Sequence, residues 1–93
     1  MPPLIFRTDF PEHCRTREME GLILVFHRPS GSTQFIASPA REMLMLLAER
    51  PMDAATLARR LCEAMDVPCD EEALSVVAAR LDELVGNGLV QAG

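Results

Sequence analysis

The sequence predicts an α+β domain of the winged-helix type, in which a small antiparallel β-sheet is followed by three α-helices. Two apolar runs, residues 22–26 and 33–37, flank a Pro-Ser-Gly turn and indicate a β-hairpin. Three segments with apolar side chains at helical spacing come after it, and Pro, Gly or Asp bounds each of them. A chain of 93 residues, 48% of them hydrophobic, has room for one domain with one modest core.

The secondary-structure signals are weakest in the N-terminal part of the chain. Residues 4–7 form a short β-like run, and we expect a strand there. Residues 8–21 are polar and rich in turn-forming residues, although residues 16–19 are also compatible with a strand. We therefore expect residues 1–21 to form a strand and a loop that lead into the better-defined hairpin.

The hairpin is the clearest β-structure in the sequence. Residues 22–27 predict a strong strand, and because they are almost all apolar, we expect both faces of this strand to be covered for part of its length. Pro29 and Gly31 suit the loop conformations of a turn. Residues 33–37 then predict the returning strand, which carries no charged side chain.

Ser38 and Pro39 predict the start of the first helix. A Ser hydroxyl can cap a helix, and Pro suits the first helical position, where an N–H has no partner. The helix runs to about Glu49, shortly before another Pro. One face carries apolar residues at helical spacing: Ala40, Met43, Leu44 and Leu47. Met45 and Leu46 lie off that face, so we expect a central helix with neighbours on several sides.

Two further helices follow, each preceded by an Asp that can cap it. Asp53 precedes a helix over residues 54–65, and Asp70 precedes one over residues 71–85. The predicted buried stripe of the second helix comprises Ala54, Leu57, Ala58, Leu61 and Met65. That of the third comprises Ala73, Leu74, Val77, Ala78, Leu81, Leu84 and Val85. A Gly-Asn-Gly sequence ends the third helix, and residues 89–90 are expected to form a short extended tail.

Charge and composition narrow the classes of partner. The net charge of −5 and the lack of a basic stripe disfavour binding to nucleic acid or to an anionic membrane. The N-terminus lacks the basic and apolar regions of a signal peptide, and no apolar run approaches the roughly 20 residues that span a bilayer. The three cysteines form no spaced framework, which favours reduced thiols and a cytoplasmic protein.

Residue types that carry catalysis or bind metals are scattered. The two His and three Cys residues lack the short spacing of a zinc knuckle or ribbon, so we expect no metal site and no cofactor. Cys62 is expected to pack as a small hydrophobic residue. The sequence has no nucleophile elbow and no Gly-rich phosphate loop, and helix capping explains the carboxylates at 70–72. We therefore expect no enzymatic activity in this chain.

Two kinds of interaction fit the predicted fold. The third helix ends like the recognition helix of a winged-helix DNA-binding protein. Its exposed side would carry three acidic residues and one Arg, which disfavours phosphates: Glu72, Ser75, Ala79, Arg80, Asp82 and Glu83. The returning strand at 33–37 can accept an extended peptide as an added strand beside a helix. The pattern alone, however, favours an edge that is covered by the chain itself or by a second copy in a homodimer.

Five segments follow one another in a specific order and spacing: LILVFHRPSG, STQFIASPA, REMLMLLAERP, DAATLARRLCEAMDVP and DEEALSVVAARLDELVGNGLVQ. Together they resemble the PqqD-like family. Its members are the small peptide chaperones, or RiPP recognition elements, named after a protein of pyrroloquinoline quinone (coenzyme PQQ) biosynthesis. The segment PSGSTQFIASPA is similar to the subgroup found with an HPr-kinase-related protein, the HPr-rel-A system. Residues 1–21 match no motif of the family.

The resemblance implies a winged-helix fold and a mechanism. A precursor's leader peptide adds as a strand beside the second hairpin strand, lies against the third helix, and is presented to a modifying enzyme, often a radical-SAM protein. Carried over to this chain, the peptide-binding residues are Thr33, Gln34, Phe35, Ile36 and Ala37 on the strand and Val76, Val77, Arg80, Leu81 and Val85 on the helix. The HPr-rel-A subgroup implies a kinase-like partner protein instead. A DNA-binding regulator and an assembly subunit for such a partner remain the alternatives.

Overall fold

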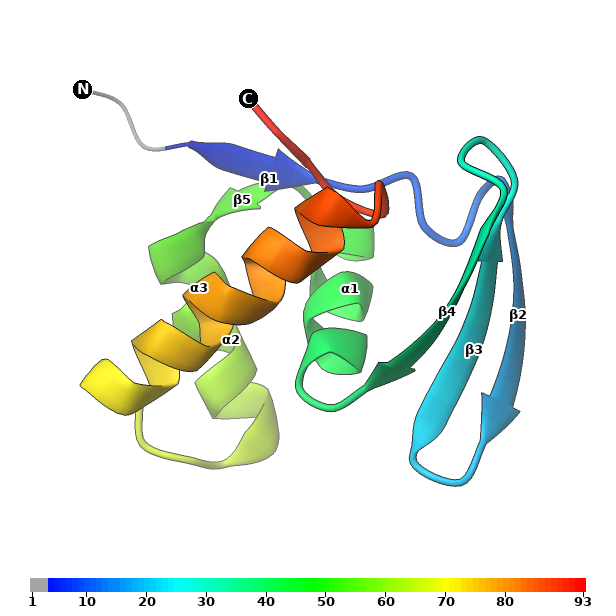
Figure 1. Ribbon diagram of the computed structural model, residues 1–93. Coiled ribbons are helices and arrows are strands. Elements are labelled where there is room, and N and C mark those ends of the chain that lie inside the picture. Colours follow the sequence, from blue (N-terminus) through cyan, green and yellow to red (C-terminus); the bar gives the residue numbers. More distant parts are fainter. Residues whose placement is uncertain (1–3) are drawn as a thin grey trace.

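The computed structural model describes residues 4–93 and confirms the predicted α+β fold (Figure 1). The three helices are α1 (Ala40–Glu49), α2 (Ala54–Met65) and α3 (Glu71–Gly86). A three-stranded antiparallel meander comprises β2 (Cys14–Met19), β3 (Leu22–His27) and β4 (Ser32–Ala37). A second small sheet has the order β5-β1-β6 and comprises β1 (Ile5–Arg7), β5 (Met52–Asp53) and β6 (Gln91–Ala92). In Figure 1 the meander projects from one side of the helices, and β4 leads directly into α1.

The meander has an unbroken register. β2 pairs with β3 across a two-residue turn, in which Gly21 has a positive φ of 68°. β3 pairs with β4 from the Leu22–Ala37 pair to the His27–Ser32 pair. The possible strand at 16–19 is thus part of a longer strand that begins at Cys14. Within residues 4–93, β4 has a strand partner on one side only, so it is an open edge of the sheet.

The helices bury one face of β3, whereas the other face, which was also expected to be covered for part of its length, is nowhere fully buried. Ile23, Val25 and His27 are at most 4% exposed and face the helices. On the opposite face, Leu24 is half-buried and Phe26 is 38% exposed. Side chains alternate between the two faces of a strand, and the helices lie on one side of the meander. The apolar sequence of β3 therefore includes residues that reach solvent.

Helix α1 lies at the centre of the fold, as predicted, but it begins differently. The helix starts at Ala40, with Pro39 in the N-cap position and no side-chain cap. The Ser38 hydroxyl, predicted to cap the helix, instead donates a hydrogen bond of 2.7 Å to the carboxylate of Glu42. Helix α1 contacts α2, α3, β1 and β4 through a buried face that contains Met43, Leu44 and Leu47. Met45 is 40% exposed, so this helix is not covered on all sides.

The two predicted Asp caps are present. The Asp53 carboxylate accepts a hydrogen bond of 2.8 Å from the Thr56 N–H, and Asp70 accepts one of 2.9 Å from Ala73. The buried stripes are narrower than predicted and comprise Leu57, Ala58, Leu61 and Cys62 in α2 and Val77, Leu81 and Leu84 in α3. Four residues predicted to be buried are exposed, because no described element covers their side of the helices: Met65, Leu74, Ala78 and Val85.

The second sheet ties together the two ends of the described chain. β1 pairs with β5 and β6, and the Gly93 N–H donates a hydrogen bond of 3.0 Å to the Ile5 carbonyl. Leu89 and Val90, expected to form an extended tail, are instead 0% and 1% exposed and turn the chain toward β6. The last strand therefore begins two residues after the start of the predicted tail, at Gln91.

We expect Asp53→Ala to lower the melting temperature by a few degrees at neutral pH, because the Thr56 N–H loses its acceptor. The hydrogen bonds from Thr56 lower the pKa of Asp53. A lowered folded-state pKa stabilises the fold above the ordinary value of about 4, and this contribution is lost as the pH falls through the folded-state value. The melting difference between wild type and Asp53→Ala should therefore shrink below about pH 4. Asp53→Asn, an uncharged cap, is the control, and a difference independent of pH would contradict the assignment.

We expect Thr8→Val to lower the free energy of unfolding by about 1–2 kcal/mol. The Thr8 hydroxyl donates a hydrogen bond of 2.6 Å to the Leu89 carbonyl and accepts one of 3.0 Å from the Phe10 N–H. It thereby links segments at opposite ends of the sequence. Urea denaturation measures the change, and Thr8→Ser, which keeps the hydroxyl, is the control. A larger loss for Thr8→Ser than for Thr8→Val would show that the methyl group matters more than the hydrogen bonds.

Candidate functional site

A groove of about 580 Å³ runs between the open edge of β4 and the C-terminal half of α3. Its strand side comprises Gln34, Phe35, Ile36, Ala37 and Ser38, with Ala40 at the start of α1. Its helix side comprises Arg80, Glu83, Leu84, Gly86 and Asn87. The groove thus combines a strand edge, which offers backbone hydrogen bonds, with a helix wall, which offers side-chain contacts.

The register indicates which backbone groups of β4 face the groove. Met19 and Leu22 close a two-residue turn and so form a hydrogen-bonded pair, and such pairs alternate along a strand. Along β3, residues that bond to β2 alternate with residues that bond to β4. The β4 partners of the second group are Ser32, Gln34 and Ile36. We infer that the N–H and C=O groups of the remaining β4 residues, Thr33, Phe35 and Ala37, point away from the sheet. An extended guest strand would bond to these groups.

The helix wall of the groove is close to neutral and contains a donor that lacks an acceptor. Arg80 and Glu83 form an ion pair of 3.0 Å, so their charges offset each other. The Nε of Arg80 is buried and has no hydrogen-bond partner among the described residues. Leu84 is 1% exposed and forms an apolar floor. Gly86 opens the groove, because a Cβ added there would meet no atom within 4 Å.

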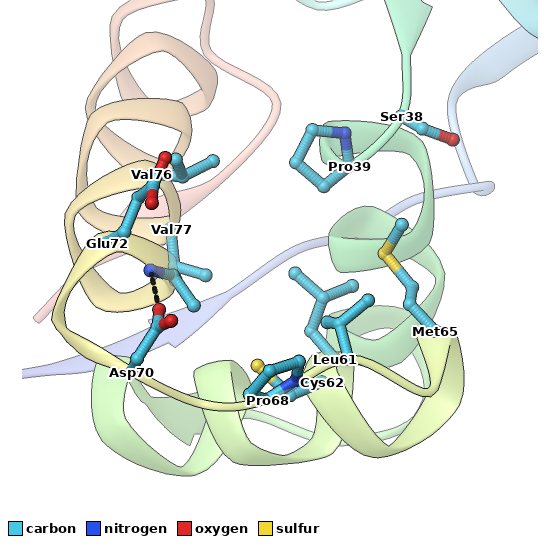
Figure 2. Close-up of a pocket in the computed structure, with 12 residues that line it drawn as sticks. Ser38, Pro39, Leu61, Cys62, Met65, Pro68, Asp70, Glu72, Val76 and Val77 are labelled. Carbon is cyan, nitrogen blue, oxygen red and sulfur yellow. Dashed lines mark hydrogen bonds between the residues drawn. The ribbon is translucent and has the colours of Figure 1, made fainter.

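A second cavity of about 370 Å³ lies further along α3, next to the groove (Figure 2). Its lining comes mainly from α2, the loop after it and the N-terminal half of α3, and includes Leu61, Met65, Val67, Pro68, Val76 and Val77. Ser38 lines both cavities, so the two are neighbours at the junction of β4 and α1. The second cavity is mostly apolar, whereas the groove offers both backbone and charged groups.

The predicted site residues fall in several places. Five of them line the groove: Gln34, Phe35, Ile36, Ala37 and Arg80. Thr33 lies on the far face of the sheet beside Phe26, and Val76 and Val77 line the second cavity. Leu81 is 2% exposed in the core, and Val85 is exposed without lining either cavity. The groove residues not predicted are Ser38, Ala40, Glu83, Leu84, Gly86 and Asn87. Three of these, Glu83, Leu84 and Asn87, follow Arg80 at helical spacing, a signal the sequence did contain.

The thiols of Cys62 and Cys14 are not activated for nucleophilic chemistry. Burial raises the pKa of the Cys62 thiol, and the nearby Cys69 and Asp70 raise it further. Burial also raises the pKa of Cys14, with a further contribution from Asp9. A thiol with a raised pKa remains protonated at neutral pH, whereas a reactive cysteine needs a lowered pKa. Within residues 4–93, no three His, Cys, Asp or Glu side chains gather closely enough to hold a metal ion.

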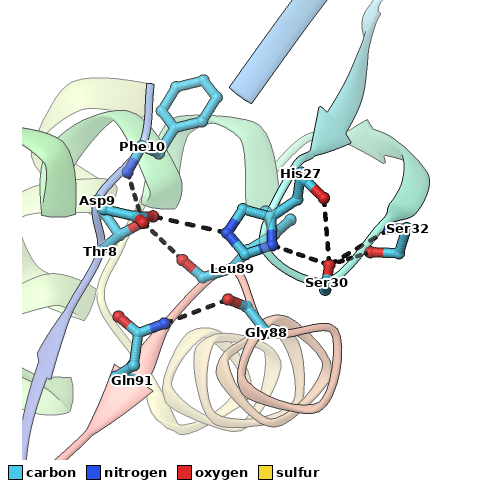
Figure 3. Close-up of polar contacts among 9 residues, drawn as sticks. All are labelled: Thr8, Asp9, Phe10, His27, Ser30, Ser32, Gly88, Leu89 and Gln91. Atoms are coloured by element: carbon cyan, nitrogen blue, oxygen red, sulfur yellow. Dashed lines mark hydrogen bonds and ion pairs between the residues drawn. The ribbon is translucent and has the colours of Figure 1, made fainter. Parts of the chain in front are cut away.

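Ser30, His27 and Asp9 form a cluster at the tip of the hairpin (Figure 3). Its residue types are those of a nucleophilic triad, but its geometry is that of a structural contact. The His27 ring is buried and shares a hydrogen bond of 2.8 Å with Ser30, while its Nε2 lies 3.8 Å from Asp9, beyond hydrogen-bond distance. The Ser30 hydroxyl also contacts the Ser32 hydroxyl at 2.7 Å and its N–H at 3.3 Å. These contacts hold the turn against the segment after β1.

Comparisons with protein-family models, with curated proteins and with solved structures found no match to this chain. Among the helices described, none has the length and apolar character needed to cross a membrane.

Proposed function

We propose that this protein is a PqqD-like peptide-recognition module without catalytic activity. It binds an extended segment of a precursor peptide as an added strand on β4 and presents that peptide to a modifying enzyme in the cytoplasm. The observation that carries this proposal is the open edge of β4 beside the groove wall of α3. An unpaired strand edge next to a helix is the arrangement that strand-addition domains use to bind peptides.

The expected affinity follows from the size of the groove. About four backbone hydrogen bonds to the β4 edge would contribute roughly 1 kcal/mol each. Two or three apolar guest side chains would add roughly 1.5–3 kcal/mol each if they were fully buried against the helix. Association and ordering remove several kcal/mol from this sum. The result is a dissociation constant on the order of micromolar to sub-micromolar.

The charges on α3 favour a peptide over DNA. Among the exposed residues of this helix, Glu71, Glu72, Asp82 and Glu83 are acidic, and Arg80 is already paired with Glu83. A recognition helix placed in a major groove would bring these carboxylates close to phosphates, which repel them. A neutral peptide backbone experiences no such repulsion.

The proposal is tested by titrating ¹⁵N-labelled protein with synthetic peptides. These peptides cover the N-terminal regions of short open reading frames that neighbour its gene. We expect saturable shifts that concentrate on residues 33–37 and on Arg80, Glu83 and Asn87. Slow amide exchange at Thr33, Phe35 and Ala37 should appear only in the complex, because those N–H groups become bonded to the guest. Shifts spread evenly over the surface, or confined to the tip of the hairpin, would contradict the proposal.

A further inference from the structure

The meander has an outer face that points away from the helices. Because alternate residues share a face and the register is known, this face is defined by nine residues: Arg15, Arg17, Met19, Leu22, Leu24, Phe26, Thr33, Phe35 and Ala37. The opposite face carries the buried residues Ile23, Val25, His27 and Ile36. The outer face is therefore separate from the core and belongs to neither helix cavity, although Phe35 and Ala37 also lie at the edge of the groove.

Large apolar side chains gather on the outer face. Phe35 is 64% exposed, Met19 49% and Phe26 38%, while Leu22 and Leu24 are half-buried. They are neighbours in space, because Leu22 pairs with Met19 and Leu24 pairs with Phe35. Isolated exposed apolar residues are ordinary, but a contiguous group rimmed by polar residues marks an interaction surface. The core does not account for these five side chains.

The charge on this face has the opposite sign to that of the whole protein. Arg15 and Arg17 stand opposite Phe26 and Leu24, and neither forms an ion pair with any residue of the described chain. None of the nine residues is acidic, although the protein has a net charge of −5. A hollow of about 280 Å³ lies between the two arginines, with Leu24, Phe26 and Thr33 also in its lining. The face thus combines an apolar floor with two cationic groups that have no counter-charge.

We propose that the outer face is a second docking surface, which binds a protein partner carrying an apolar side chain bordered by Asp or Glu residues. The apolar side chain would enter the hollow, and the carboxylates would pair with Arg15 and Arg17, where Arg favours bidentate contacts. Such a face attracts an acidic partner and repels a basic one, and electrostatic matching of this kind sets specificity.

Charge complementarity favours this acidic protein partner over three other possible occupants of the outer face: a second copy of the chain, an anionic membrane and nucleic acid. In a two-fold dimer through this face, the face would meet itself, and its arginines would find no acidic residue. An anionic membrane is held by clusters of roughly four to eight basic residues, whereas this face has two on an acidic protein. Single-stranded nucleic acid can stack on aromatic residues but needs a basic groove along its backbone.

The inference does not depend on the proposed function, because the outer face is exposed whether or not the groove holds a peptide. If the outer face binds a partner and the groove also binds a peptide, the guest strand added to β4 would widen the sheet that carries the outer face. Alternate side chains of the guest would then lie beside Phe35 on the outer face. A partner docked there would contact the guest directly, which is what presentation of a peptide to an enzyme requires.

The test selects binders from a phage-displayed library of random linear peptides on immobilised wild-type protein. We expect enriched sequences that combine Leu, Phe, Ile or Trp with Asp or Glu. Synthetic versions should bind about tenfold more weakly to Phe26→Ser and to the double variant Arg15→Glu/Arg17→Glu. The double variant should instead select peptides with Lys or Arg. Gly86→Phe, which alters only the helix side of the groove, should bind the same acidic peptides as wild type.

Three results would overturn the inference. Enriched peptides that lack acidic residues, or that keep their affinity for the double variant, would show that the arginines do not select the partner. Sedimentation equilibrium showing a wild-type dimer that Phe26→Ser dissociates would assign the face to a second copy. Binding of phosphatidylserine vesicles or of oligo(dT), abolished in the double variant, would assign it to a membrane or to nucleic acid. Circular dichroism of each variant verifies that a lost interaction is not lost folding, and Phe26→Leu replaces Phe26→Ser if the latter unfolds.

Discussion

Gly86→Phe is expected to abolish peptide binding to the groove while the domain remains folded. Gly86 lies on the helix side of the groove, and a Cβ added to it meets no atom within 4 Å. An aromatic ring at this position can therefore occupy the space between α3 and β4 without disturbing the core. A guest strand would lose its helix-side contacts, which we expect to weaken binding by at least about a hundredfold.

The matched control for this prediction is Gly86→Ala. A methyl group leaves most of the groove open, so binding should change little. Because Ala favours a helix over Gly, this variant should be more stable than wild type by up to about 1 kcal/mol. Isothermal titration calorimetry with the peptide identified by NMR measures binding, and thermal unfolding measures stability. If Gly86→Phe binds the peptide as tightly as Gly86→Ala does, the guest does not lie in this groove.

Leu81→Ala is expected to lower the free energy of unfolding by about 2–5 kcal/mol. The resemblance to the PqqD-like family placed Leu81 among the peptide-binding residues, but its side chain is 2% exposed and packs in the core. Removing three of its side-chain carbon atoms leaves a cavity that the neighbouring helices fill only in part. For a domain of this size, such a loss is a large fraction of the total stability.

Arg80, the residue before Leu81, is expected to affect peptide binding more than stability. Arg80→Ala should change stability by less than about 1 kcal/mol, because its ion pair with Glu83 is partly exposed. The same variant should weaken peptide binding, since it removes the long side chain that forms part of the helix wall of the groove. Urea denaturation and calorimetry on both variants separate the two roles. If Leu81→Ala weakened binding without a loss of stability, Leu81 would have to face the groove, contrary to its burial.

Several elements could be predicted from the sequence because short-range chemistry decides them. The strand Leu22–His27 and the helix Ala54–Met65 have the predicted bounds, and Asp53 and Asp70 cap the helices that follow them. A capping carboxylate needs only the N–H three residues further on, and an apolar stripe needs only a spacing of three or four residues. Neither the cap nor the apolar stripe depends on a distant part of the chain. The open edge of β4 is different, because it requires that no distant segment pairs with this strand, and the sequence pattern alone favoured an edge covered by the chain itself or by a second copy.

Other features depended on which surfaces meet in the folded chain. The apolar strand β3 was expected to be covered on both faces for part of its length, yet the helices cover one face only, and Phe26 reaches solvent on the other. Leu89 and Val90 were expected to form an extended tail, yet the packing of the chain ends buries them. Val76 and Val77 were grouped with Arg80, yet they line a different cavity. An apolar residue in a sequence does not specify its neighbour, because the hydrophobic effect has no direction.

The sequence by itself determined the α+β class, the order of the main strands and helices, the two Asp caps and a strand edge without charges. Only the tertiary structure decided the rotation of α3, and with it the assignment of Arg80 to the groove and Leu81 to the core. The physical reason is that local hydrogen bonds and spacing define a helix but leave its rotation open. That rotation is set by the volume of the side chains that must fill one common core.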